Sequence, residues 1–294
     1  MLFRKITIIG VGLLGGSIGL AVKRRKLARQ AAGFVRREAS LRNSERAGAV
    51  DFATTDLLAA VWDADLVVLC TPLAQMRPIA ERLLPALKRD AIITDVGSVK
   101  ASVVRDLESL VARADAHFVG SHPMAGAEKT GVAAARSDLF EKTVCVVTPT
   151  RKTDRRALNK VKQLWIAVGS RVLELKPETH DALVSRSSHL PHLVAAALAN
   201  YVLDPTQPKH QSTLCANGFR DTTRIASGSP EMWRDIALAN RRNLARALRD
   251  FNAALMKFQQ ALSRADAKAV TRLFEQAKRR RDAWCACCAS PSPE

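Results

Sequence analysis

The sequence has few aromatic residues and no long apolar run. Phe, Trp and Tyr make up 5% of its 294 residues, and there is a single Tyr. Proteins that stack on nucleic-acid bases need aromatic side chains, so this scarcity argues against nucleic-acid binding. A membrane helix needs roughly 20 consecutive apolar residues, and none is present. The N-terminus also lacks the apolar region and cleavage site of a secretory signal, so we expect a soluble, cytoplasmic protein with no nucleic-acid or membrane partner.

Disulfide and metal-binding spacings are missing as well. The six cysteines stand at positions 70, 145, 215, 285, 287 and 288, without a framework pattern, so we expect them to be reduced. The group Cys285, Cys287 and Cys288 has no histidine nearby, whereas structural zinc takes four well-spaced ligands. We therefore predict no metal site.

Basic residues are in clear excess. The chain has 46 Lys and Arg against 28 Asp and Glu, which gives a net charge of +18. These cations are spread along the chain, and the clusters Lys23–Lys26 and Lys278–Arg281 are typical of solvated helix ends. A positive field of this kind also attracts an anionic substrate and a phosphate-bearing cofactor.

Two different patterns divide the chain. From residue 5 to about 175, short β-rich runs alternate with helical patterns, which is typical of a parallel sheet with crossover helices. The expected strands are Lys5–Ile9, Ala31–Val35, Leu66–Cys70, Ile92–Asp95, His117–Gly120, Thr143–Thr148 and Arg171–Glu174. The expected helices of the second half are His180–Leu203, Ser212–Ser227, Pro230–Ala261 and Ala265–Ala286. We therefore predict an α/β domain over residues 1–175 and an all-helical domain over residues 176–294.

The third of these helices carries a long apolar stripe. Its members, expected on one continuous helix, are Leu238, Leu244, Leu248, Phe251, Leu255 and Phe258. A stripe of this length indicates core or a subunit interface, so we expect a homodimer formed through the helical domain.

A glycine-rich turn follows the first expected strand. The motif GxGxxG comprises Gly10, Gly12 and Gly15, with Leu13 and Leu14 between them, and it opens a helix. Its glycines permit a tight turn, close approach of a pyrophosphate and close helix packing, and the helix N-terminus offers amide donors to phosphate. This context predicts a Rossmann-type, doubly wound parallel sheet that binds a dinucleotide, followed by the all-helical domain.

The second strand indicates which dinucleotide is bound. An acidic residue about 20 residues beyond the glycines normally binds the ribose hydroxyls of NAD. Here Arg36 and Arg37 follow the strand, and guanidinium groups suit a 2′-phosphate, so NADP is favoured while NAD stays open. Thr71 and Pro72 end another apolar strand and are expected to border the cofactor.

A histidine near this site suits proton transfer. His122 follows a strand in a loop rich in Pro and Gly, and an imidazole that titrates near neutrality can accept a proton as an alcohol is oxidised. Ser98, in the run Asp95–Lys100 after another strand, is a candidate partner for the same hydroxyl, or else a helix cap.

These islands, in this order, resemble the prephenate/arogenate dehydrogenase family. The resemblance extends from Gly10 to about Asp235, and the segments HPMAGAE at His122 and SHLPH at Ser188 are its most specific parts. It implies oxidative decarboxylation of prephenate to 4-hydroxyphenylpyruvate, or of arogenate to tyrosine, in tyrosine biosynthesis. It also implies that His122 accepts the proton of the ring hydroxyl with help from Ser98.

Further roles come only from this resemblance. It implies that Arg224 binds a substrate carboxylate, that His192 and Asp221 shape the pocket, and that Glu128 forms an ion pair with Arg224 that gates it. His189 lies three residues before His192, so it is a candidate for the same pocket or a structural histidine.

Two other functions remain open from the residues alone. A β-hydroxyacid dehydrogenase shares the two-domain layout, but it is expected to use a catalytic Lys that has no counterpart in context here. A non-catalytic nucleotide sensor or nucleic-acid-binding protein would have no use for a proton acceptor beside a carboxylate clamp. The choice between prephenate and arogenate is not decided by any residue that we can assign.

Overall fold

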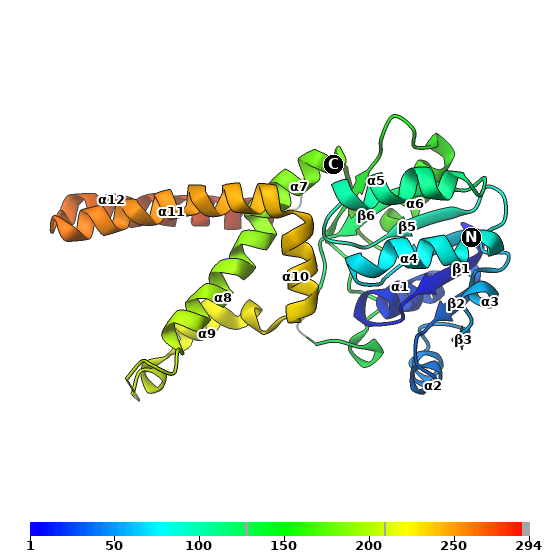
Figure 1. Ribbon diagram of the computed structural model, residues 1–294, viewed down its shortest axis with the longest axis horizontal. Coiled ribbons are helices and arrows are strands. Elements are labelled where there is room, and N and C mark those ends of the chain that lie inside the picture. Colours follow the sequence, from blue (N-terminus) through cyan, green and yellow to red (C-terminus); the bar gives the residue numbers. More distant parts are fainter. Residues whose placement is uncertain (127–128, 209, 290–294) are drawn as a thin grey trace. The chain divides into compact units, whose positions relative to one another are not determined.

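The computed structural model describes residues 1–126, 129–208 and 210–289, and the side chains as far as residue 286 (Figure 1). The chain divides into two compact units, Met1–Asn243 and Leu244–Glu294. None of the helices in the described ranges combines the length and the hydropathy that crossing a bilayer would require. In the same ranges, no cluster of three His, Cys, Asp or Glu side chains could hold a metal ion.

The first unit is built on one eight-stranded sheet. Its strands are β1 (Phe3–Ile9), β2 (Ala28–Phe34), β3 (Phe52–Thr54), β4 (Leu66–Leu69), β5 (Ile92–Asp95), β6 (His117–Pro123), β7 (Val144–Thr148) and β8 (Arg171–Glu174). They lie in the order β3-β2-β1-β4-β5-β6-β7-β8, and all neighbours are parallel except β6 and β7. This is the doubly wound order, and its direction reverses between β1 and β4, where such sheets bind ligands.

Helices cover both faces of the sheet. They are α1 (Leu13–Arg24), α2 (Ala39–Arg46), α3 (Leu57–Val61), α4 (Leu73–Leu83), η1 (Leu84–Ala86), α5 (Ala101–Ala112), η2 (Val132–Ala134) and α6 (Arg155–Ala167). Strands β4 and β5 are buried on both faces, which explains their continuous apolar sequences. The side chains of Asp56 and Asp154 accept hydrogen bonds from the first turns of α3 and α6 and so begin these helices.

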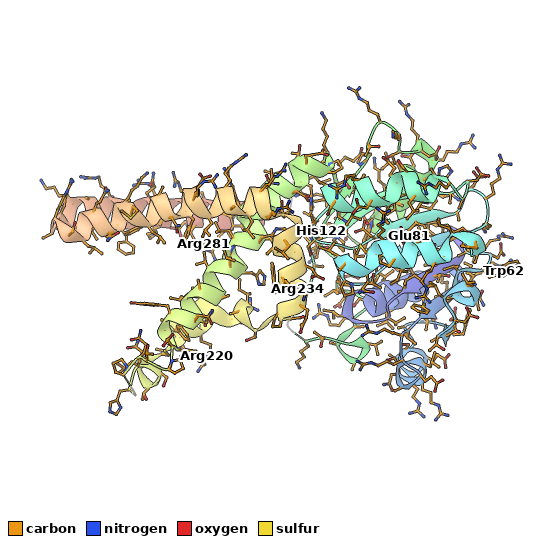
Figure 2. The ribbon with its side chains drawn as sticks, viewed as in Figure 1. Trp62, Glu81, His122, Arg220, Arg234 and Arg281 are labelled. Atoms are coloured by element: carbon orange, nitrogen blue, oxygen red, sulfur yellow. The ribbon has the colours of Figure 1, made fainter. Side chains whose placement is uncertain are left out.

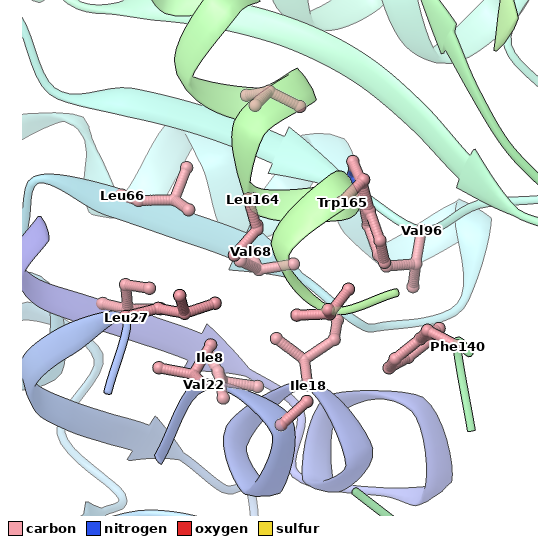
Figure 3. Close-up of a cluster of buried hydrophobic side chains, with 14 of the residues drawn as sticks. Ile8, Ile18, Val22, Leu27, Leu66, Val68, Val96, Phe140, Leu164 and Trp165 are labelled. Carbon is pink, nitrogen blue, oxygen red and sulfur yellow. The ribbon is translucent and has the colours of Figure 1, made fainter. Parts of the chain in front are cut away.

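Two apolar cores hold these layers together. One core joins α1 and α6 to the sheet, and Figure 3 shows Ile18 of α1 and Trp165 of α6 near Val68 of β4. The other core joins α3, α4 and α5 to the opposite face. Because helices cover both faces of the sheet, we expect a ligand to bind at the uncovered ends of the strands.

The rest of the described chain is helical. It comprises α7 (Pro177–Val184), the π-helical segment η3 (Ser185–His189), α8 (Leu190–Val202), η4 (Ser212–Leu214), α9 (Asn217–Thr223), η5 (Arg224–Ser227), α10 (Pro230–Ala239), α11 (Arg241–Ser263) and α12 (Ala267–Ala289). The all-helical nature predicted from the periodicity is confirmed.

Several expected boundaries were wrong. Strand β6 continues to Pro123, so His122 lies on a strand and not in a loop, because β7 pairs antiparallel with this extension. The short edge strand β3 was missed. The helix expected over Pro230–Ala261 breaks at Asn240, which separates Leu238 on α10 from the rest of the apolar stripe on α11.

Candidate active site

The glycine turn between β1 and α1 has the geometry of a phosphate cradle. Gly10 has φ +96°, and a Cβ at this position would lie 2.7 Å from the carbonyl oxygen of Cys70. A Cβ on Gly15 would lie 2.1 Å from the carbonyl oxygen of Gly10. At Gly12, by contrast, a Cβ would meet no atom within 4 Å. Gly10 and Gly15 are thus required by packing, whereas the space at Gly12 is free for a ligand.

The surroundings of this turn leave polar groups for a ligand. Helix α1 begins at Leu13 and Leu14, both half-buried, and no side chain caps its first amides. At the end of neighbouring β4, the Thr71 hydroxyl oxygen is buried and has no hydrogen-bond partner among the described residues. Pro72 follows it as the N-cap of α4. A dinucleotide with its phosphates at α1 fits these features.

The end of β2 lacks the acidic residue that is expected there. Val35 is buried where an acidic residue is expected, and Arg36 and Arg37 follow it with exposed side chains. Neither guanidinium takes part in an ion pair among the residues that the structure describes. Both are therefore available to an anionic group of a ligand.

His122 lies near the end of β6 in a buried pair of imidazoles. Its Nδ1 lies 2.8 Å from Nε2 of His180 on α7, and the two rings meet edge to face. The Nδ1 atom of His180 lies 2.8 Å from a carboxylate oxygen of Asp181. Figure 2 labels His122, which is 7% exposed and so keeps limited contact with solvent. A chain of two imidazoles and one carboxylate therefore begins at the candidate proton acceptor.

Asp181 also joins α7 to the start of α5. Its two carboxylate oxygens accept hydrogen bonds from the backbone amides of Lys100 (2.7 Å) and Ala101 (2.9 Å). Its backbone carbonyl accepts a hydrogen bond of 2.8 Å from the side-chain amide of Asn240. A buried carboxylate with this many donors is firmly oriented.

A second buried network of hydrogen bonds joins the end of β5 to β6. The Lys100 ammonium pairs with the Asp95 carboxylate, and both side chains are fully buried. The same ammonium donates a 2.9 Å hydrogen bond to the carbonyl oxygen of Ser121, next to His122. The Ser121 hydroxyl donates to the carbonyl of Asp95 at 2.6 Å and accepts from the indole nitrogen of Trp165 at 3.1 Å. These contacts hold the ends of β5 and β6 in one position.

The surroundings of His122 favour an uncharged imidazole. Burial, in the first place, lowers its pKa well below the usual value of 6.5, and electrostatic interactions with His180, Lys100 and His189 lower it further. An imidazole that is neutral at neutral pH can accept a proton.

The other predicted site residues have varied surroundings. The half-buried Ser98 makes no hydrogen bond with His122, and Lys100, not Ser98, is the N-cap of α5. His189 is buried, with Nδ1 3.2 Å from the Asn240 amide and no partner for Nε2 among the described residues. Burial lowers the pKa of His189 to about 4. Glu128 lies outside the described residues.

The remaining candidates lie where η5 packs on α8. The ring of His192 stacks on Trp233 with centroids 3.8 Å apart, and its Nδ1 lies 3.0 Å from the carbonyl oxygen of Ile225. Arg224, the residue before Ile225, is exposed, as is Asp221 on α9. The structure thus brings His192 and the start of η5 together, whereas Asp221 faces solvent.

Four buried polar residues of the site escaped the sequence reasoning. They are Asp95, Lys100, His180 and Asp181. The available signals were an Asp that ends an apolar strand and a His–Asp pair on a helix. Neither signal indicated that these side chains are buried together. Their burial depends on contacts between distant residues, such as His122 and His180, which are 58 residues apart along the chain.

Comparisons with known proteins identify the family of this chain. The family model described as the nucleotide-binding domain of prephenate dehydrogenase matches residues 18–174, and the dimerization domain of the same enzyme matches residues 176–276. A prephenate dehydrogenase of Bacillus subtilis is 36% identical over 285 residues, which cover 94% of this chain and 75% of that protein.

Solved structures give the same result. The prephenate dehydrogenase of A. aeolicus, in complex with hydroxyphenyl propionate and NAD+, has a TM-score of 0.89 at 34% identity, covering 95% of this chain and 98% of that one. The arogenate dehydrogenase of Synechocystis has a TM-score of 0.80 at 31% identity, covering 96% of this chain and all (100%) of that one. With the glycine turn and the His122 strand in place, the chain belongs to the prephenate dehydrogenase family.

Proposed function

We propose that this protein catalyses the NAD(P)-linked oxidative decarboxylation of prephenate to 4-hydroxyphenylpyruvate, of arogenate to tyrosine, or of both. The observation that carries the proposal is the buried, uncharged His122 on β6, a strand that runs parallel to β1 and so ends at the same edge of the sheet as the dinucleotide turn. The names of the prephenate and arogenate dehydrogenases similar to it supply the substrate class. We expect the enzyme to work in the cytoplasm, in the biosynthesis of tyrosine.

His122 acts as the proton acceptor. It takes the proton of the ring hydroxyl as a hydride leaves the same ring carbon, and the proton returns to the ring oxygen afterwards. The ring carboxylate departs as carbon dioxide, and the electron pair of the broken carbon–carbon bond stays in the ring, which becomes aromatic. The hydride is the only reducing equivalent released, and no net proton is consumed.

Substrate carboxylates are bound by residues of the helical half. Arg224 is exposed at the start of η5, and a guanidinium pairs bidentately with a carboxylate. His192 and His189 belong to the same part of the helical half, because the ring of Trp233 contacts both imidazoles. We retain Ser98 as a hydrogen-bond partner of the substrate hydroxyl, Asp221 as a residue that shapes the pocket, and Glu128 as a residue whose ion pair gates it.

The cofactor is held by Gly10, Gly12 and Gly15, by the first amides of α1, and by Thr71 with Pro72. When bound, a nicotinamide dinucleotide takes up the hydride. The exposed Arg36 and Arg37, neither of which is ion-paired among the described residues, favour NADP over NAD.

The protein forms a homodimer through its helical part. The match to a dimerization domain supports this, and so do large apolar side chains that are exposed in the second unit. They are Leu255, Met256, Leu262, Phe274 and Trp284. Sedimentation at micromolar concentration tests it, and a monomer would contradict it.

Turnover tests the main proposal. Purified protein is given prephenate or arogenate, each with NAD or NADP, and absorbance of the reduced cofactor is followed. We expect turnover with at least one pair, and a loss of at least about 100-fold in kcat in His122→Ala. His117→Ala, at the half-buried start of the same strand, is the matched control and should keep its activity. Tight cofactor binding without turnover of any pair would refute the proposal.

The cofactor preference has its own test. Replacing Arg36 and Arg37 together by Ala should raise KM for NADP by ~10-fold or more and leave KM for NAD nearly unchanged, because only the 2′-phosphate loses its partners. The control is Arg29→Ala, an exposed arginine near the start of β2, whereas Arg36 and Arg37 follow its end. Equal effects on both cofactors would contradict the assignment.

A further inference from the structure

We propose that Asp181 is a positioning residue that fixes the tautomers of two histidines in series, so that Nε2 of His122 is the basic nitrogen of the site. The inference rests on the geometry of one buried chain of contacts, from α5 through α7 to β6. For its kinetic consequences it also rests on the proposed function.

The chain starts with a group that can only accept. The ionised Asp181 carboxylate already accepts from the amides of Lys100 and Ala101 at the start of α5. Its contact of 2.8 Å with Nδ1 of His180 must therefore be a third accepted hydrogen bond. The proton of a neutral His180 is thus placed on Nδ1, and its Nε2 keeps a lone pair.

The second step transmits this choice to His122. Nε2 of His180 and Nδ1 of His122 are 2.8 Å apart in a buried setting, where two facing lone pairs would repel each other. Since Nε2 of His180 can only accept, Nδ1 of His122 must donate. The lone pair of a neutral His122 then lies on Nε2, the nitrogen that is not engaged with His180 and is left for a substrate hydroxyl.

Asp181 is also the carboxylate that can stabilise the charge formed when His122 takes a proton. The groups that face His122 from each packed element are His180 on α7, Lys100 before α5, His189 in η3 and the Cys145 thiol on β7. None of these is anionic at neutral pH, because burial raises the pKa of the Cys145 thiol.

The second nearby carboxylate is already engaged. Asp95 is paired with the Lys100 ammonium, and both side chains are fully buried. Asp181 has no ammonium or guanidinium partner among the described residues, since its donors are two backbone amides and one imidazole. The negative charge of Asp181 can therefore stabilise a proton on the pair of imidazoles.

The first experiment measures the tautomers directly. The full-length protein is labelled with ¹⁵N at its six histidines, and the imidazole resonances of His122 and His180 are identified by their loss in the His122→Gln and His180→Gln variants. At neutral pH we expect protonated Nδ1 and unprotonated Nε2 for both residues. A spectrum with Nε2 of His122 protonated would overturn the proposal, whether or not the protein turns over any substrate.

The second experiment measures the catalytic consequence. In Asp181→Asn we expect kcat to fall by ~100-fold or more, with KM for the substrate changed by less than about 3-fold. The acid limb of kcat should move to lower pH, because a protonated imidazole pair loses its neighbouring negative charge. A purely structural Asp181 would lower the amount of folded protein and leave the midpoint of this limb where it was.

Controls separate the possible failures. Asp90→Asn removes a carboxylate from an exposed turn and should keep both kcat and the acid limb. If the native enzyme turns over no substrate, the proposed function fails while the tautomers remain measurable. If the native enzyme is active and Asp181→Asn keeps its kcat and pH profile, the proposed function stands and the role of Asp181 is refuted. If Asp181→Asn does not fold, the tautomers of the native protein decide the question.

Discussion

The buried ion pair of Lys100 and Asp95 offers a sharp test of what holds the site together. Lys100→Met keeps an unbranched side chain of similar length but removes the ammonium. The Asp95 carboxylate then keeps only the amide donors of Gly97 (2.8 Å) and Ser121 (3.1 Å). The carbonyl oxygen of Ser121 loses its 2.9 Å hydrogen bond as well.

The expected loss follows from the burial of both partners. Their side chains are fully inaccessible to solvent, and removing one member of a buried pair costs about 3–5 kcal/mol, because the remaining charge has no counterion. For a unit of this size, each kcal/mol corresponds to roughly 2–4 °C, so the melting temperature should fall by roughly 10 °C. The double variant Asp95→Asn with Lys100→Met removes both charges and should recover most of this loss.

Urea unfolding followed by tryptophan fluorescence measures these energies, since the buried Trp165 donates a hydrogen bond to Ser121 of the same network. A cost below about 1 kcal/mol for Lys100→Met would refute the reasoning. Losses that simply add in the double variant would refute it too, because they would mean that the two charges are not coupled. Kinetics give an independent check: loss of the Lys100 charge should raise the pKa of His122 and move the acid limb of activity to higher pH.

Other predictions concern the glycine turn and the buried histidines. Gly12→Ala should fold normally and weaken cofactor binding ~10-fold or more, whereas Gly15→Ala should lower the melting temperature, because its Cβ would lie 2.1 Å from the carbonyl of Gly10. Titration calorimetry measures the first effect and a thermal scan measures the second. Normal cofactor affinity in Gly12→Ala would contradict the phosphate cradle. His189 has a pKa of about 4 in the folded protein, against 6.5 in the unfolded chain. Between these two pH values the unfolded chain binds a proton at His189 and the folded protein does not, so the free energy of unfolding falls as the pH falls. The total is about 3 kcal/mol between pH 6.5 and 4, and His189→Gln should flatten the measured dependence of unfolding free energy on pH; an unchanged slope would contradict this.

Local patterns in the sequence predicted much of the fold. The apolar run before Gly10 and the helix after it depend on contacts between near neighbours, so β1, the turn and α1 were found together. The periodicity beyond residue 176 predicted helices, which the structure confirms. The predicted domain boundary at residue 175 stays a prediction, since the boundary between the two compact units falls after Asn243.

Errors arose where distant residues decide the local structure. The extension of β6 through His122 depends on pairing with β7, about twenty residues further along the chain. The break at Asn240 coincides with side-chain hydrogen bonds to Asp181 and His189, which lie 59 and 51 residues away. Neither interaction has a signature in the local apolar pattern.

The sequence by itself determined the dinucleotide turn, the alternation of strands and helices before residue 175 and the helices after it, and the choice of His122 as the proton acceptor candidate, because each depends on residue types within one short segment. Only the tertiary structure decided how His122 is held and which nitrogen is free. Parallel strands bring their carboxyl ends to one edge of the sheet, and the packing of α7 there places His180 and Asp181 against residues 58 and 81 positions away in the sequence. The environment that sets a pKa or a tautomer is made by such contacts, and linear spacing does not encode them.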